Sequence, residues 1–232
     1  MIRAIFGWGI LNIELNILVG MSNLSTYWND RFSNEGMIWG EAPSKTAYHA
    51  LELFQNSKHT IRTVLVPGSG YGRNTKALSS FFRVDGIELS TDAISMAIKW
   101  DPKSQFIQGS VLEQLAGDKK YDAIYCYDVL HLFLQEDRQR LIHHCIQQLN
   151  EEGLMYFTCF SDEDRNNGVG GKLEEGTFEY VEGKYAHFFT EEDLIEHFEG
   201  LQVIETGTTC ETLTYNDNRS KEYILRYIVV KR

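Results

Sequence analysis

Short apolar runs alternate along the chain with segments in which apolar residues recur every three or four positions. The short runs predict strands at Thr63–Val66, Arg83–Leu89, Gln105–Ile107, Tyr121–Tyr127 and Leu154–Phe160. The periodic segments predict helices over 73–82, over 91–100, and from about 141 until Gly153 ends the last one. Strands that alternate with helices of about 10 to 15 residues are typical of a parallel sheet covered on both faces. The pattern therefore predicts one doubly wound α/β domain.

The two ends of the chain depart from this alternation. Tyr27–Arg31 and Ser44–Phe54 predict short helices ahead of the first strand. Near the other end, apolar alternation predicts a long antiparallel hairpin from Leu201 to Val230, with its turn at 216–218. Between the fifth strand and this hairpin, Asp162–Gly183 is rich in Gly, Glu and Asn, and we expect a mobile, lid-like loop there.

The first 20 residues are apolar but are interrupted by Asn12, Glu14 and Asn16. A membrane span needs about 20 apolar residues without charge, and no small-residue cleavage site is evident for a signal peptide. We expect residues 1–20 to form a peripheral extension and the domain to occupy residues 21–232.

Composition narrows the range of partners. The chain has 232 residues, and its 33 acidic and 22 basic residues give a formal charge of −11. Such a surface repels phosphate backbones, so we expect a small-molecule partner and no nucleic acid. The four cysteines (Cys126, Cys145, Cys159 and Cys210) form no C-x-x-C pair and have no histidine at metal-ligand spacing. Free thiols of this kind predict a cytoplasmic protein without a metal site.

The first strand leads into a glycine-rich turn at Gly68, Ser69, Gly70 and Gly72. Glycines at a strand–helix turn allow a ligand to lie against the backbone, next to the free N–H groups of the helix. Glu88 ends the next strand, where a carboxylate can accept hydrogen bonds from both hydroxyls of a ribose. Together these features predict a nucleoside cofactor site; by itself, a tight turn beside a solvated acid would explain the glycines equally well.

The spacing of the glycines distinguishes between cofactors. A dinucleotide fold has the pattern G-x-G-x-x-G, whose third glycine would fall at position 73, but that residue is Arg73. The third glycine here is Gly72. S-adenosylmethionine has no pyrophosphate and suits this turn better than a nicotinamide dinucleotide does.

At this point the sequence resembles the class I S-adenosylmethionine-dependent methyltransferases, over roughly residues 25–232. The segments that carry the resemblance are Val64–Gly72, Gly86–Ser90, Gly109–Leu112, Tyr121–Ile124 with Asp128–His131, and Leu149–Leu154. Tyr27–Phe32 and Ile38–Ser44 look like the start of the tellurite-resistance and thiopurine-type small-molecule methyltransferases. The resemblance implies a Rossmann-like, seven-stranded, mostly parallel sheet with an antiparallel C-terminal hairpin. It also implies a helical cap at 21–60, a cofactor-binding half at 61–160, and a substrate loop and hairpin at 161–232.

The resemblance also implies a set of cofactor-binding residues. They are Gly68, Ser69, Gly70, Gly72, Glu88, Leu89, Ser110, Val111, Cys126, Tyr127, Trp39, Trp28 and Arg31. Ser110 and Val111 are expected beside the adenine, and Cys126 and Tyr127 beside the sulfonium. The family commonly has an acid two positions before the first glycine, where this chain has Val66. Either backbone carbonyls near Gly68 and Tyr127 hold the ammonium group of the methionine part, or another acid replaces the missing one, for which Asp128 is a candidate.

Methyl transfer from a sulfonium requires alignment of the nucleophile, and a general base only if the nucleophile arrives protonated. His131 and His187 are the residues we expect to contact the substrate or act as a base; both also suit a structural role. The expected function is methyl transfer to a small molecule such as a thiol or a metalloid oxyanion, by a monomer or homodimer. The alternatives are a non-catalytic cofactor-binding module and an NAD-dependent oxidoreductase.

Overall fold

The computed structural model of the chain describes residues 25–113, 119–181, 184–214 and 220–232. The expected extension at 1–20 and the hairpin turn at 216–218 lie outside these described residues. None of the helices within them is long and apolar enough to cross a membrane.

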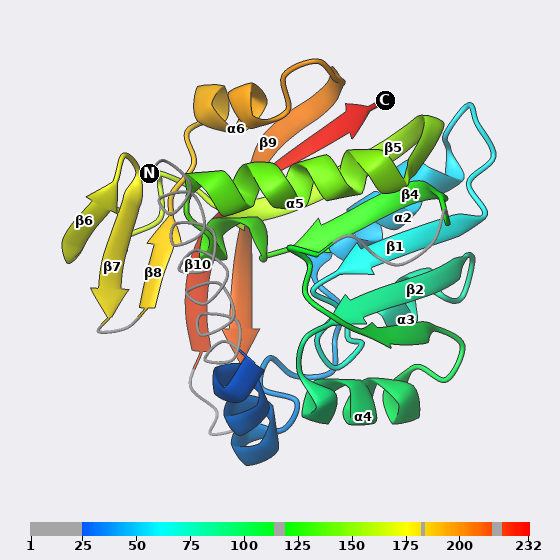
Figure 1. The fold of residues 1–232 in the computed structure, drawn as a ribbon, viewed down its shortest axis with the longest axis horizontal. Coiled ribbons are helices and arrows are strands. Elements are labelled where there is room, and N and C mark those ends of the chain that lie inside the picture. The colour runs from blue at the N-terminus through cyan, green and yellow to red at the C-terminus, as the bar shows by residue number, and fades with distance from the viewer. Residues whose placement is uncertain (1–24, 114–118, 182–183, 215–219) are drawn as a thin grey trace, which may run out of the picture.

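A seven-stranded sheet with the order β3-β2-β1-β4-β5-β10-β9 forms the centre of the molecule (Figure 1). Its strands are β1 (Thr63–Pro67), β2 (Arg83–Glu88), β3 (Gln105–Gln108), β4 (Tyr121–Tyr127), β5 (Leu149–Phe160), β9 (Gln202–Thr214) and β10 (Ser220–Lys231). Strands β1 to β5 pair in parallel, and β10 runs antiparallel to both β5 and β9. The predicted doubly wound sheet with an antiparallel C-terminal hairpin is therefore confirmed.

Helices cover both faces of this sheet. They are the helical residues 25–35, α2 (Lys45–Gln55), α3 (Thr75–Leu78), α4 (Thr91–Trp100), the single turn η1 (Leu130–Leu132), α5 (Gln135–Gln148) and α6 (Glu191–His197). Alternation along β1 divides the core: Leu65 is buried with residues of α5 and α6, whereas Val64 and Val66 are buried with residues of α2 on the opposite face (Figure 1). Parallel strands buried on both faces explain the continuous apolar runs in the sequence.

Two predicted boundaries are wrong. The helix expected over 73–82 is only four residues long, Thr75–Leu78, and ends well before β2. Strand β5 begins at Leu149, five residues ahead of the predicted start, because α5 ends at Gln148 and not at Gly153. The chain changes direction there without a glycine, since Leu149 already has extended backbone angles.

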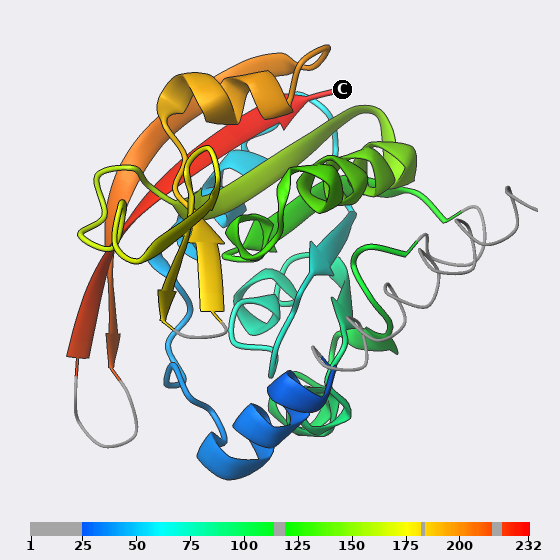
Figure 2. The ribbon, with the colours of Figure 1, turned by 60° about the vertical axis from the view of Figure 1, so that its left-hand side comes forward.

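Part of the segment predicted as a loop, 162–183, forms strands from Gly171 onward, so the loop prediction is wrong there, whereas 162–170 form turns and bends. Strands β6 (Gly171–Glu174), β7 (Thr177–Val181) and β8 (Lys184–His187) make a small antiparallel sheet, which stands beside the main one (Figure 2). Gly176 makes the turn between β6 and β7 with φ +69°. Gly170, at φ +88°, brings the backbone so close to Glu179 that a Cβ atom would lie 2.1 Å from its carbonyl oxygen. Gly170 and Gly176 are thus required by close packing, whereas a Cβ atom at Gly168 or Gly171 would meet nothing within 4 Å.

Candidate active site

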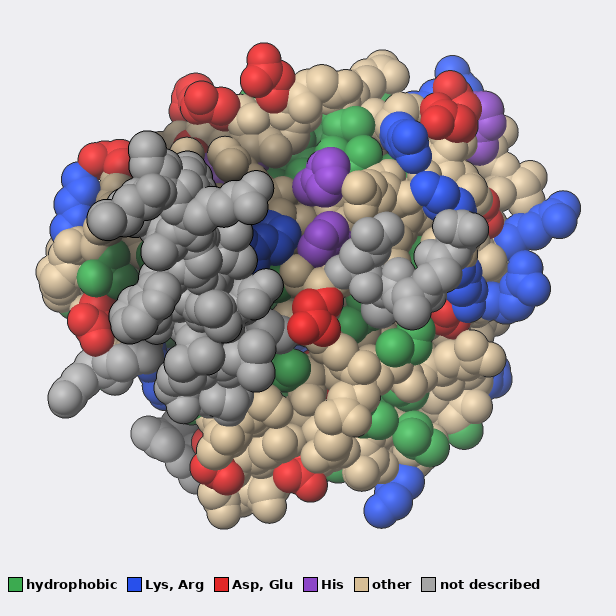
Figure 3. Space-filling view, in the orientation of Figure 1, with side chains coloured by type: hydrophobic (Ala, Val, Ile, Leu, Met, Phe, Trp, Pro, Cys, Tyr) green, Lys and Arg blue, Asp and Glu red, His purple; other side chains and the backbone are tan. Residues whose placement is uncertain are grey.

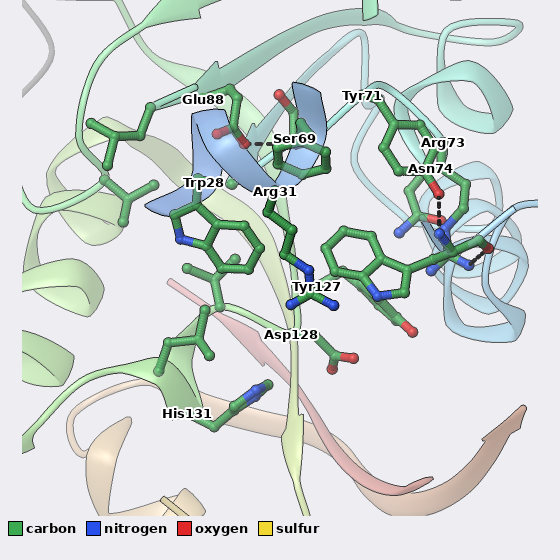
Figure 4. A pocket seen from close by; sticks show the side chains of 18 of the residues that line it. Trp28, Arg31, Ser69, Tyr71, Arg73, Asn74, Glu88, Tyr127, Asp128 and His131 are labelled. Atoms are coloured by element: carbon green, nitrogen blue, oxygen red, sulfur yellow. Dashed lines mark hydrogen bonds between the residues drawn. The ribbon is translucent and has the colours of Figure 1, made fainter. Parts of the chain in front are cut away.

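A cavity opens where the parallel strands of the main sheet end (Figure 4). The turn after β1 and the ends of β2, β3 and β4 line one part of it, and the helical residues 25–35 lie over them. The ends of β5, β7, β9 and β10 line the other part. Ligands of open α/β sheets bind at this edge because the carboxyl ends of the strands and the loops after them meet there.

The glycine turn forms the floor of the cavity. Gly68 and Gly70 have φ values of +68° and +55°, which favour glycine. A Cβ atom at Gly68 would lie 2.3 Å from the Cγ2 atom of Val129. Gly68, Ser69 and Gly70 line the cavity as expected, but Gly72 does not. A Cβ atom at Gly72 would meet Thr75 and Ala97 within 3.4 Å, so this glycine permits helix packing instead.

Glu88 faces the glycine turn from the end of β2. Its carboxylate accepts a hydrogen bond from the backbone N–H of Gly70 at 2.9 Å and one from that of Ser90 at 2.8 Å. Only 7% of the residue is exposed, and this burial raises its pKa although the two backbone donors favour the ionised form. The carboxylate is therefore held in one orientation at the cavity wall, and each oxygen retains a lone pair for a ligand.

Residues 25–35 place aromatic side chains over the turn. Phe32 packs on Trp28 and on Tyr71, with ring centroids 5.7 Å and 6.0 Å apart. Trp39 stacks on Tyr71 at 6.1 Å, and the Tyr71 hydroxyl donates to the carbonyl of Gly40 at 2.7 Å. These contacts tie the N-terminal segment to the glycine turn.

Arg31 lies between two indole rings at the cavity. Its guanidinium carbon is 5.8 Å from the ring centroid of Trp28 and 5.6 Å from that of Trp39, and all three side chains line the cavity (Figure 4). Arg31 also forms an ion pair with Glu35, with the Nε atom 3.5 Å from the carboxylate. The three N-terminal residues expected at the cofactor are therefore placed at one wall.

The expected residues on the far side of Glu88 are also at the cavity. Leu89 follows β2, and Ser110 and Val111 follow β3; all three line the cavity, beside Gly109. The backbone N–H of Gly109 donates to the carbonyl of Glu88 at 3.0 Å, which holds these two segments together. They form the wall next to the predicted ribose position.

Strand β4 ends in the middle of the cavity with Tyr127 and Asp128, which both line it. Cys126 does not line it; the side chain is fully buried in the core on the α5 side of the sheet, where burial raises the pKa of its thiol. Strand alternation explains this outcome, because neighbouring residues of β4 point to opposite faces. Val66, in the place where the family has an acid, is likewise buried in the core.

Asp128 has an unusual position for an acid. Its φ is +55°, and its carboxylate accepts a hydrogen bond from the Oγ1 atom of Thr158 at 3.0 Å. Burial raises its pKa to about 7, against the hydrogen bond from Thr158 and the nearby positive charge of Arg73. The cations among the described lining residues are Arg31 and Arg73, and of these two it is Arg73 whose charge lowers the pKa of Asp128.

The two histidines have different surroundings. His131 lines the cavity and stacks on Phe160, with ring centroids 3.9 Å apart and planes 13° apart. Its Nδ1 atom is buried and has no hydrogen-bond partner among the described residues, and burial lowers its pKa to about 3. His187 is not a lining residue. Its ring nitrogens contact the Thr177 hydroxyl at 2.8 Å and the Asp193 carboxylate at 2.6 Å, so it joins the small sheet to α6.

Several lining residues escaped the sequence analysis. They are Arg73, Phe160, Tyr180, Leu213 and Tyr223. Arg73 directly follows Gly72, and its guanidinium donates to the carbonyl of Trp39 at 3.2 Å and lies 5.4 Å from the ring centroid of Tyr127. The aromatic residues come from β5, β7 and β10, and the alternation of Phe178 and Tyr180 is the sequence signal that a strand, and not a loop, brings Tyr180 here.

Comparisons with known proteins agree with this geometry. Residues 65–157 match the family model described as a methyltransferase domain. A search of curated proteins gave no match. A S-adenosylmethionine-dependent methyltransferase of Anabaena variabilis is 20% identical, with a TM-score of 0.66 over 91% of this chain and 94% of that one. TehB of Haemophilus influenzae is 15% identical, with a TM-score of 0.63 over 88% of this chain and 67% of the other.

A third similar structure comes from Burkholderia thailandensis. It is a 1,6-didemethyltoxoflavin-N1-methyltransferase with S-adenosylhomocysteine bound, 16% identical, with a TM-score of 0.64 over 94% of this chain and 89% of that one. The chain therefore carries a methyltransferase domain, which uses S-adenosylmethionine, in the fold shared by the class I S-adenosylmethionine-dependent methyltransferases.

Proposed function

We propose that this protein transfers a methyl group from S-adenosylmethionine to a small molecule bound in the same cavity. The observation that carries the proposal is the Glu88 carboxylate, which is buried at the cavity wall and fixed by the backbone of the glycine turn that it faces. A fixed acceptor beside a turn without side chains suits an unphosphorylated ribose, because a phosphate there would be repelled.

The remaining lining residues fit the other parts of the cofactor. Ser110 and Val111 are our proposed contacts for the adenine, on the β3 side of Glu88. Arg31 supplies a positive charge for the carboxylate of the methionine part, and Asp128 supplies a negative charge for its ammonium group. Asp128 thus takes the place of the acid that is missing at Val66. The Ser69 hydroxyl, which is buried without a hydrogen-bond partner among the described residues, is a further polar group for the ligand.

When bound, S-adenosylmethionine supplies a methyl group on a sulfonium, which is already a good leaving group. The chain therefore has to align the acceptor and exclude water. Trp28, Phe32 and Trp39 cover the glycine turn and keep that side of the cavity apolar. We infer that residues 61–160 hold the cofactor and that 161–232 complete the acceptor side of one domain.

Charge supports a small acceptor over a nucleic acid. On the face seen in Figure 3, Lys and Arg side chains gather at the right, beside the amino ends of β1 and β4, away from the edge where the cavity opens. The net charge of −11 also disfavours a phosphate backbone as the methyl acceptor. The four free cysteines support a cytoplasmic location, and we infer a monomer or homodimer.

Calorimetry tests the cofactor. S-adenosylmethionine, S-adenosylhomocysteine and NADH are titrated separately into the protein. The first two are expected to bind and NADH is not, because the turn lacks the third glycine of a dinucleotide site. Binding of NADH alone would make the protein an oxidoreductase and remove the proposal.

A turnover screen tests the transfer. Formation of S-adenosylhomocysteine is followed with thiols, selenite, tellurite, amines, phenols and small carboxylates. Turnover of at least one class, without nucleic acid, is expected; the thiol and metalloid oxyanion predicted from the sequence belong to this screen. A protein that binds the cofactor and turns over none of them fits the alternative of a non-catalytic module.

A further inference from the structure

The cavity divides into two parts of different chemistry at the end of β4. The part over β1, β2 and β3 holds the glycine turn and Glu88, which the proposed function assigns to the cofactor. The part over β5, β7, β9 and β10 is lined by Phe160, Tyr180, Leu213 and Tyr223, together with His131. Because β5, β10 and β9 lie on the opposite side of β4 from Glu88 in the order of the main sheet, we assign this second part of the cavity to the acceptor.

Rings with nearly parallel planes form the wall of the acceptor part. The plane of Phe160 lies 13° from that of His131, with centroids 3.9 Å apart, and 9° from that of Tyr223, with centroids 5.4 Å apart. These rings come from η1, β5 and β10, three elements far apart in sequence. Phe188, a buried residue that does not line the cavity, packs on Phe160 with its plane 24° away. Such a wall favours a flat ligand that continues the stack over a puckered one of equal size.

The imidazole of His131 is a polar group of this wall, in addition to the hydroxyls of Tyr180 and Tyr223. It is 3% exposed, and its buried Nδ1 atom has no partner among the described residues. A buried polar atom without a partner is costly, and a ligand that hydrogen-bonds to it removes that cost. Its lowered pKa leaves the ring neutral at pH 7, so it can accept a hydrogen bond but carries no charge to attract an anion.

The charges of the lining disfavour an oxyanion as acceptor. Among the described residues, the cations that line the cavity are Arg31 and Arg73. Arg31 is paired with Glu35 and lies between the indoles of the cofactor part. Arg73 donates to the carbonyl of Trp39. The wall of parallel rings thus offers a selenite or tellurite ion no cation of its own.

We propose that the methyl acceptor is a flat aromatic or heteroaromatic molecule with a hydroxyl or ring N–H, stacked on the wall of His131, Phe160 and Tyr223 and hydrogen-bonded to the His131 imidazole. This inference rests on the proposed function, since an acceptor bound in this part of the cavity can be methylated only if the cofactor is bound beside it. In the transfer, the oxygen or nitrogen of the acceptor forms a bond to the methyl carbon. The carbon–sulfur bond breaks with its electron pair staying on sulfur, and the proton of the acceptor passes to water.

Matched ligands test the flatness of the site. The protein is first saturated with S-adenosylhomocysteine, and 2-naphthol, decahydro-2-naphthol and selenite are then titrated by calorimetry. The first two are neutral and have the same carbon skeleton, but the rings of 2-naphthol are flat and those of decahydro-2-naphthol are puckered. We expect 2-naphthol to bind about tenfold more tightly, since each stacked pair favours the flat ring. Equal or tighter binding of decahydro-2-naphthol or of selenite would overturn the inference.

Three variants test whether the rings of His131 and Phe160 cause the preference for 2-naphthol. Phe160→Leu should abolish the preference for 2-naphthol over decahydro-2-naphthol. His131→Phe keeps a ring on Phe160 but removes the hydrogen bond. It should lose about fivefold in affinity for 2-naphthol and none for 2-fluoronaphthalene, which has no donor. Tyr48→Leu changes an aromatic residue of α2 that is 54% exposed outside the cavity, and should leave every affinity unchanged.

The design separates the two proposals. If S-adenosylhomocysteine does not bind, the proposed function fails and the acceptor inference fails with it. If S-adenosylhomocysteine binds and 2-naphthol does not, the acceptor inference alone fails. Each variant is titrated with S-adenosylhomocysteine as well, so that a misfolded protein is recognised by the loss of that binding; His131→Phe then still tests the wall if Phe160→Leu does not fold.

Discussion

Replacing Asp128 by Asn is expected to stabilise the protein at pH 8 and to weaken its binding of the cofactor. Burial raises the pKa of Asp128 to about 7, so the carboxylate is ionised at pH 8 in a site that disfavours its charge. Asn keeps the shape and tolerates the φ of +55° at this position. The ionised Asp128 thus destabilises the folded protein, and we expect the ammonium group of the bound cofactor to offset this effect.

The size of this cost follows from the pKa. The unfolded chain loses the proton near the ordinary value of 3.8, whereas the folded protein keeps it up to about 7. The protonated Asp128 therefore contributes its full stabilisation of the folded protein below pH 3.8. This contribution is lost as the pH rises to about 7, by about 1.4 kcal/mol for each pH unit. The ionised Asp128 then costs about 4 kcal/mol at pH 8, an upper bound because the site relaxes.

Urea unfolding at pH 5, 6.5 and 8 measures this cost. The stability of the Asp128→Asn variant relative to the natural chain should rise from pH 5 to 8, by about 3 kcal/mol. Glu52→Gln, which removes an exposed acid of α2, serves as the control and should show no such rise. A stability difference that does not change with pH would contradict the raised pKa.

Binding measures the compensating gain. At pH 8 the natural chain should bind S-adenosylhomocysteine about tenfold more tightly than Asp128→Asn, and the two should approach equality at pH 5.5 as Asp128 takes up its proton. Both proteins meet the same ligand, so titration of the ligand cancels in the ratio of their affinities. Equal affinities at pH 8 would refute Asp128 as the replacement for the missing acid.

Two further substitutions test the packing around the cavity. Gly68→Ala should lower the free energy of unfolding in urea by about 2 kcal/mol or more, because the new Cβ atom meets Val129 and the φ of +68° is strained for alanine. Adding Val129→Ala removes the clash and should recover only part of this loss. Full recovery would show that backbone strain contributes nothing. Glu174→Ala should cost about 3 kcal/mol, because it leaves the buried guanidinium of Arg138, 2.7 Å from that carboxylate, without its ion-pair partner. A cost below about 1 kcal/mol would show that this pair does not hold the small sheet.

The parallel half of the fold was predictable because its strands are buried on both faces. Tyr121–Tyr127 was predicted at its observed bounds, since six of its seven residues are apolar or aromatic, as is typical of a central parallel strand. Ser44 and Ser90 mark the starts of α2 and α4 and each accepts a hydrogen bond in the first turn. Elements whose structure depends on residues close together in the sequence, such as these strands and helix starts, could therefore be predicted.

The acceptor side was less predictable because long-range contacts decide it. Strands β6 and β7 are short and rich in Glu and Gly, and they exist through pairs such as Thr177 with His187. His187 looked like a substrate residue, but it binds Asp193 six positions later, on the first turn of α6. The stack of Phe160 on His131 joins two elements whose sequences share no local signal. Such pairings appear only once the topology is known.

The most direct test of the account is the affinity of Glu88→Ala for S-adenosylhomocysteine. The buried carboxylate is our proposed partner of both ribose hydroxyls, and hydrogen bonds to a charged group contribute about 1.5–3 kcal/mol each. The account predicts at least about a tenfold loss of affinity in calorimetry at pH 7.5, with Glu52→Gln unchanged. An unchanged affinity of Glu88→Ala would contradict the placement of the cofactor in this cavity.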